Sequence, residues 1–125
     1  MILRQNNLII GMKDNNNGVQ DGNYNGKITD IRLKAQQATQ YGFKDILTAE
    51  VEIDLDVTQI KKNTSYYISD KEGTRFSRFL DDMKIDRNSE EFDVNELLDV
   101  KVEVTIKNNK VGDTVYSNID RIVAI

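Results

Sequence analysis

The 125-residue chain contains no cysteine and no histidine. The absence of thiols excludes disulfides, thiolate zinc sites, iron–sulfur clusters and cysteine nucleophiles, and it is typical of a reducing cytoplasm. The absence of imidazoles removes the usual general base at neutral pH, the serine triad and the commonest transition-metal ligand. We therefore expect a protein that acts by binding, with no catalytic residue, no metal and no cofactor.

Long apolar runs are missing as well. The longest run near the start, residues 8–12, is too short for the core of a signal peptide and much too short to span a bilayer. We therefore expect a cytoplasmic protein with no membrane insertion. The formal net charge is −4, which is opposite to the basic character that nucleic-acid binding predicts.

The remaining pattern is that of one small β-rich domain. Alternation of apolar and polar residues predicts strands near residues 25–35, 47–56, 64–69, 100–107 and 115–123. The alternation slips between Ile28 and Ile31, which indicates a β-bulge. Polar stretches predict a loop at 36–42, a basic connection at Lys61 and Lys62, and a hairpin closed by residues 108–110 with Gly112 and Asp113 at its far end. Residues 1–23 are expected to form a leader, partly mobile or adding an edge strand, before a domain at 24–125.

A helix is predicted between the third and fourth strands. Phe76, Phe79, Leu80 and Met83 recur at helical spacing, and the polar residues Arg75, Arg78, Asp81 and Asp82 are expected on the opposite side. Three strands, a helix and two strands follow one another in the order of the OB fold. That fold is a five-stranded Greek-key barrel in which the helix plugs one end. We therefore expect an all-β domain of this type with one short helix.

Two segments add a more specific resemblance. The closing part of the chain reads FSRFLDDMKI, then EFDVNELLDVKVEVTIKNNKVGDTVYSNIDRI, and an earlier segment reads YNGKITDI. Together they resemble the helix, closing hairpin and opening strand of small OB-fold single-stranded-DNA-binding proteins of Gram-positive phages and mobile elements. The family often has glycine where this chain has Asp99. The resemblance implies a module that binds single-stranded DNA weakly, with salt sensitivity and little sequence preference.

An OB barrel binds extended ligands on its second and third strands, between two loops. Aromatic rings stack on bases there, and lysine or arginine contacts phosphates. The corresponding candidates in this chain are Tyr41, Lys44, Tyr67, Arg32, Lys34, Lys107 and Lys110. The alternative interpretation is equally open: the tyrosines are rim packing, and the lysines only keep the protein soluble.

The polar side of the second strand argues for a different function. Four carboxylates, Glu50, Glu52, Asp54 and Asp56, alternate with its apolar residues and would repel a DNA strand laid along them. They form a candidate interaction face. Through it the protein would dock on a basic protein partner, or act as an inhibitor by imitating DNA. A charged exposed strand that resists edge pairing is the simpler interpretation. Oligomeric state is open, and a homo-oligomer is compatible with the pattern.

Two metal interpretations are weaker. A magnesium-dependent nuclease would use Asp54 or Asp56 with Asp81 and Asp82, but adjacent residues of a helix point in different directions. A calcium loop at Asp14, Asn16, Gly18 and Asp21 lacks the required glycine and bidentate glutamate, so an ordinary turn is favoured.

Overall fold

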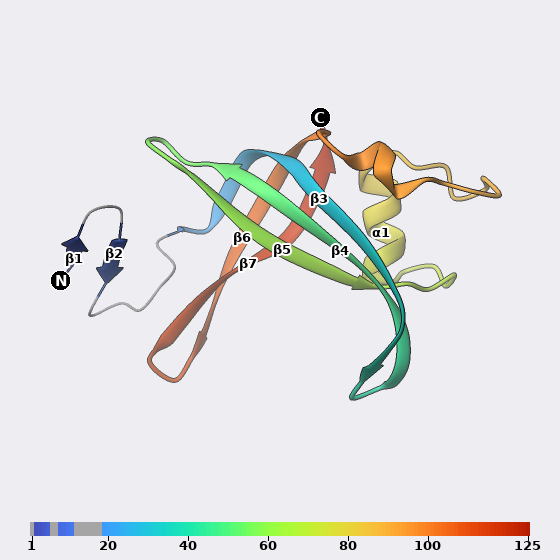
Figure 1. Ribbon diagram of the computed structural model, residues 1–125, viewed down its shortest axis with the longest axis horizontal. Helices are drawn as coiled ribbons and strands as arrows, with labels where there is room; N and C mark the ends of the chain where they lie inside the picture. The colour runs from blue at the N-terminus through green and yellow to red at the C-terminus, as the bar shows by residue number, and fades with distance from the viewer. Residues whose placement is uncertain (1, 6–7, 12–18) are drawn as a thin grey trace.

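The computed structural model describes residues 2–5, 8–11 and 19–125 (Figure 1). Its elements, in chain order, are β1 (Ile2–Gln5), β2 (Leu8–Gly11), β3 (Gly22–Thr39), β4 (Gly42–Asp54), β5 (Gln59–Tyr67), α1 (Arg75–Asp82), the 3-10 turn η1 (Val94–Leu97), β6 (Lys101–Val111) and β7 (Thr114–Ala124). The described chain is thus mostly β with one short α-helix. Strands β1 and β2 pair with each other in a separate two-stranded sheet.

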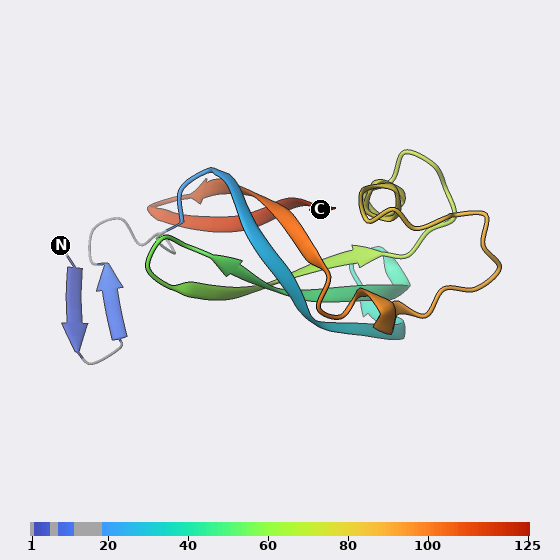
Figure 2. The same ribbon diagram turned by 90° about the horizontal axis from the view of Figure 1, so that it is seen from above.

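The other strands form one antiparallel sheet in the order β5-β4-β3-β6-β7. Strand β3 joins its two halves, because Gly22–Lys27 pairs with β6 and the stretch from Gly26 onward pairs with β4. Figure 2 shows β3 passing from the layer of β6 and β7 to that of β4 and β5. At the crossover, a Cβ on Gly26 would lie 2.8 Å from the carbonyl oxygen of Glu52. The close approach of two partner strands therefore requires glycine at this position.

The core lies between the two halves of the curved sheet. The predicted alternation of the second strand is confirmed, since Leu47, Ala49, Val51 and Ile53 of β4 are all buried. The bulge predicted near Ile28 is confirmed as well, because the pairing of β3 with β4 shifts register between Ile28 and Asp30. The remaining buried apolar side chains are Val19, Ile28, Ile31, Tyr66, Phe79, Met83, Leu97, Val102, Val104, Ile106, Ile119 and Ile122.

Helix α1 covers one end of this core, as the helical spacing predicted. Thr74 caps its first turn, because the hydroxyl oxygen accepts a hydrogen bond from the backbone N–H of Ser77 at 3.0 Å. The Phe79 ring lies on Tyr66, with centroids 4.5 Å apart. In the described ranges, no helix combines the length and apolar character needed to cross a membrane.

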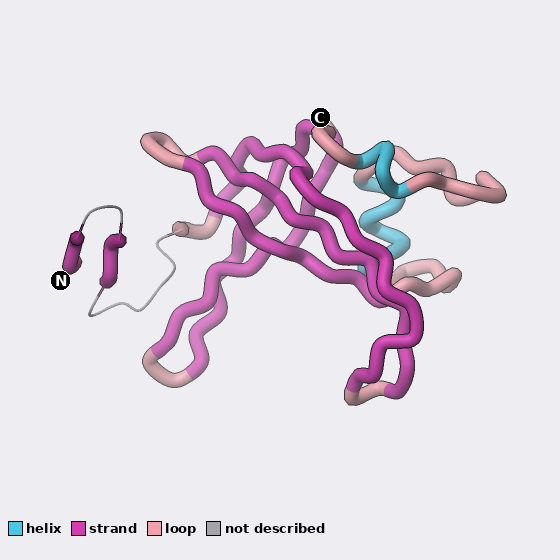
Figure 3. The backbone as a smooth tube through the Cα atoms, viewed as in Figure 1, coloured by secondary structure: helices cyan, strands magenta, loops and turns pink. Residues whose placement is uncertain are grey.

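Two expected loops are shorter than predicted, because strands continue into them. Strand β3 extends to Thr39 and β4 begins at Gly42, so most of the expected loop at 36–42 is strand. Strand β6 likewise runs through 108–110, whereas the turn at Gly112 and Asp113 lies where the far end of the hairpin was expected. Beyond the core, backbone pairing holds these ribbons together without apolar alternation, which is why the pattern missed them. We call residues 32–46 the β3–β4 arm and residues 107–118 the β6–β7 arm; Figure 3 shows them projecting on one side of the sheet, at opposite ends.

The basic connection expected at Lys61 and Lys62 is wrong. Both residues belong to β5, which starts at Gln59, and they pair with Glu52 and Val51 of β4. An edge strand has only one partner and little burial, so apolar alternation is weak there.

Asp82 does not lie on the polar side of α1, where it was expected. Its side chain is 8% exposed, and its carboxylate accepts a hydrogen bond at 2.7 Å from Nε of Arg121 in β7. Asp81, its neighbour, pairs at the surface with Arg87, at 3.1 Å. One carboxylate therefore fastens α1 to β7, while the next faces solvent.

We expect the Asp82→Asn variant to lose about 2 kcal/mol of unfolding free energy, because a buried charge-assisted pair is broken. The Asp81→Asn variant should lose less than about 0.5 kcal/mol, since its ion pair is exposed. Urea unfolding followed by circular dichroism compares the two, and equal losses would contradict the assigned role of Asp82.

Candidate nucleic-acid interface

A groove of about 670 Å³ opens at the edge of β5, between the β3–β4 arm and the beginning of α1. Its walls combine aromatic, hydroxyl and cationic side chains. They come from β3 (Lys34, Gln37), β4 (Ile46, Thr48), β5 (Ser65, Tyr66, Tyr67) and the segment leading into α1 (Ser69, Thr74, Arg75, Phe76). The chemistry of this lining suits a ligand with flat rings, polar edges and negative charge.

Tyr41 and Tyr67 were predicted separately as stacking residues, and the structure brings them together. Tyr41 lies in the turn of the β3–β4 arm, and Tyr67 ends β5 opposite Ile46. Their ring centroids are 6.2 Å apart, with an angle of 79° between the planes. Tyr41 is 67% exposed and Tyr67 is 46% exposed. Both rings therefore keep free surface on which a base can stack.

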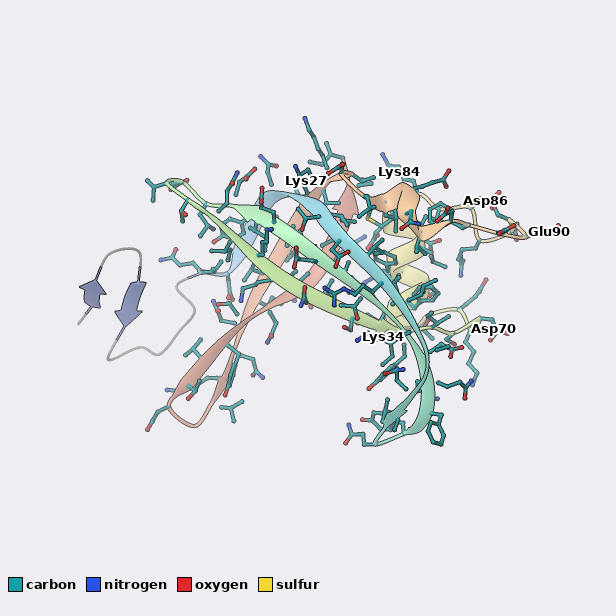
Figure 4. All side chains as sticks on the ribbon, in the orientation of Figure 1. Lys27, Lys34, Asp70, Lys84, Asp86 and Glu90 are labelled. Carbon is teal, nitrogen blue, oxygen red and sulfur yellow. The ribbon has the colours of Figure 1, made fainter. Side chains whose placement is uncertain are left out.

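The three predicted cations of the β3–β4 arm, Lys34, Lys44 and Arg32, differ in where they lie and what they contact. Lys34 lines the groove, and Figure 4 places it where the arm leaves the sheet. Lys44 pairs with Gln37 farther along the arm and is exposed. Arg32 is already engaged, because its Nε donates a hydrogen bond to Asp30 at 2.8 Å. The same hydrogen bond lowers the pKa of the Asp30 carboxyl below its ordinary value.

Lys107 and Lys110 do not line the groove. Both lie on the β6–β7 arm, where alternation along β6 places them on opposite faces of the ribbon. The Lys107 ammonium lies 3.6 Å from Asp120 of β7. The structure therefore separates these two predicted contacts from the tyrosine pair.

Paired hydroxyls lie beside the tyrosines. Oγ1 of Thr48 and Oγ of Ser65 are 2.9 Å apart, and either group can be the donor. A hydroxyl that can donate or accept meets the edge of any base. Such a lining favours binding without strong sequence preference.

The predicted acidic row is interleaved with cations. The Glu50 carboxylate accepts a hydrogen bond from Thr29 at 2.8 Å and lies 3.8 Å from the Lys61 ammonium. Glu52 is paired across the sheet with Lys27 on one side and Lys61 on the other. Lysines of the neighbouring strands thus stand beside the carboxylates of β4.

The other two carboxylates of this row lie near its end. Asp54 closes β4 and accepts a hydrogen bond from Gln59 at 2.9 Å. Asp56 was expected on the strand but lies in the turn after it, because β4 ends at Asp54. The four carboxylates therefore do not form one continuous face.

The metal interpretations find no geometric counterpart in the described ranges. Three or more carboxylates placed to share an ion are not found within residues 2–5, 8–11 and 19–125. Asp14, Asn16 and Gly18 of the suggested calcium loop lie outside those ranges. Asp21 is described, and its carboxylate accepts a hydrogen bond from the backbone N–H of Asn108 at 2.7 Å. That bond ties the start of β3 to β6.

Arg75 was not expected to contribute to a binding site, but it lines the groove. Its guanidinium lies over the Tyr66 ring, 4.3 Å from the centroid, and donates hydrogen bonds to β5 and β7. Burial against this end of the core raises the pKa of the Tyr66 phenol. A polar residue at helical spacing is normally expected to face solvent. Only the position of α1 beside β5 therefore shows that Arg75 lies in the groove.

The bond between Arg32 and Asp30 gives a direct test of the arm's electrostatics. We expect Arg32→Gln to raise the Asp30 pKa back toward its ordinary value, because the charged form loses its donor. Carboxyl carbon chemical shifts measured against pH report the change, and Lys34→Gln serves as the control. If the pKa of Asp30 is the same in the Arg32→Gln variant as in the natural chain, the two side chains are not paired in solution.

No protein-family model matches the chain, and its sequence has no significant match among curated proteins. The function is therefore inferred from the fold and the groove.

Proposed function

We propose that this chain is a single-stranded nucleic-acid-binding module built on an OB-type barrel. The contact of Tyr41 with Tyr67, a residue of the groove wall, carries the proposal. Exposed rings beside lysines are what a sequence-tolerant single-strand site requires, since every base has a face to stack and every nucleotide a phosphate to neutralise.

The strand order supports the OB assignment. β3 pairs with both β4 and β6, and α1 lies between β5 and β6 along the chain. This connection is compatible with the five-stranded, partly open Greek-key barrel that the proposal requires. Asp99, which stands where the resembled family has glycine, adopts a left-handed φ of 66°. The backbone there has the conformation that glycine favours.

In this proposal, bases stack on Tyr41 and Tyr67 while Lys34 and Lys44 contact phosphates. Duplex DNA has its bases already stacked on one another, so it offers no free base face to the tyrosines. Binding is expected to be weak and to fall steeply with salt, because phosphate contacts release counterions.

Docking of a basic protein on β4 has less support. The Glu50 carboxylate lies 3.8 Å from the Lys61 ammonium, and Glu52 stands in register with Lys27 and Lys61, so a partner would meet lysines as well as carboxylates on this face. A partner would have to displace these neighbours before it gained ion pairs.

The decisive experiment is fluorescence anisotropy of a labelled oligothymidine of about thirty residues, long enough to exceed the usual OB-fold site size. We expect binding to the single strand that weakens between low and physiological salt, and little binding to duplex of the same length. The absence of single-strand binding at low salt would refute the proposal.

Variants of Tyr67 separate ring stacking from hydroxyl bonding. Tyr67→Ala should weaken binding about tenfold, because one stacked base is lost. Tyr67→Phe should bind nearly as the natural chain, since the ring remains. Val57→Ala, which trims an exposed apolar side chain outside the groove, should change nothing. Equal affinity of Tyr67→Ala and the natural chain would show that the ring does not contact a base.

A further inference from the structure

Helix α1 presents two exposed arginines whose guanidinium groups bind neutral oxygens. Nη2 of Arg75 donates to Oγ1 of Thr64 at 2.9 Å and to the carbonyl oxygen of Ile119 at 3.4 Å. Nη2 of Arg78 donates to the carbonyl oxygen of Asp120 at 3.1 Å. These bonds hold both side chains in place without cancelling their charge.

The other arginines among residues 19–125 differ in this respect. Arg32, Arg87 and Arg121 each lie within 4.0 Å of a carboxylate oxygen. Within the same described ranges, no such ion pair involves Arg75 or Arg78. Two positive charges on α1 are thus fixed in position and without a carboxylate partner.

These arginines continue the groove around the edge of β5. Arg75 lines both the groove and a second hollow of about 590 Å³, whose wall also includes Arg78. Glu72 and Asp81 also line that hollow, but Arg87 approaches them at 3.7 Å and 3.1 Å. The second hollow is therefore lined by three arginines and two carboxylates, so its local charge balance is positive.

We propose that Arg75 and Arg78 bind successive phosphates of the single strand as it leaves the groove. The strand then runs along α1 toward β7 and does not cross the carboxylates of β4. A guanidinium presents a planar fork of donors that fits a phosphate, and donors already held in place lose little freedom on binding. This inference rests on the proposed single-strand function and assigns that ligand a path.

Arg78 is the residue to test, because Arg75 also bridges β5 and β7. One phosphate contact contributes about 0.7 to the slope of log K against log salt for a single strand, so Arg78→Gln should lower the slope by about that amount. The same slope predicts a loss in affinity of about eightfold at about 50 mM salt and about threefold at about 200 mM. Arg78→Lys keeps the charge and should retain the slope.

Lys61→Gln is the matched control. It also removes one positive charge, but from a residue of β5 that lies beside the carboxylates of β4. The proposed path predicts no change in slope for this variant. Oligothymidine anisotropy over a salt series measures all four proteins, and circular dichroism checks that each is folded.

The outcomes separate the path from the function. Binding by the natural chain with an unchanged slope in Arg78→Gln would overturn the path and leave the function standing. A slope lowered by Lys61→Gln in place of Arg78→Gln would mean that the strand crosses β4, which also overturns the path. Failure of the natural chain to bind would refute the function itself.

Discussion

The junction between β5 and β7 is the constraint on which the rest of the structure depends. These strands are the two edges of the sheet, and no backbone ladder closes it between them. Helix α1 joins them through side chains: Arg75 reaches Thr64 and Ile119, and Asp82 binds Arg121. The position of α1 sets the end of the core and one wall of the groove. Core packing and the candidate site therefore rely on the same few polar bonds.

These bonds also explain how an acidic chain can present a surface for a polyanion. The net charge of −4 is a sum over the whole molecule, whereas a ligand meets only the charges along its path. On the solvent side of β4, the Glu50 carboxylate lies 3.8 Å from the Lys61 ammonium, and Glu52 stands in register with lysines of the neighbouring strands. On α1, the guanidiniums of Arg75 and Arg78 bind neutral oxygens and keep their charge. The local balance is thus opposite to that of the chain.

Much of the architecture could be predicted because an element with one buried face has apolar residues at regular spacing in the sequence. Alternation in β4 and the apolar side of α1 both follow from packing against one core. The second half of β5 was predicted from alternation, but the arms and the first half of β5, residues 59–63, could not be, because backbone pairing with a neighbouring strand stabilises them while their side chains remain largely exposed. Asp82 was misplaced for a related reason. An aspartate in a predicted helix is expected to face solvent unless its distant partner, here Arg121, is known.

For the candidate site, the sequence by itself determined the supply of groups: two tyrosines and several lysines near expected loops, with no thiol or imidazole chemistry available. Tertiary structure alone decided which of them meet. Tyr41 and Tyr67 are brought together because the β3–β4 arm continues past the core to the end of β5. Lys107 and Lys110 are carried away on the other arm, and Arg75 enters the groove from α1. The physical reason is that periodicity records burial within one element, whereas contacts between elements depend on strand length, register and helix position, which local sequence does not encode.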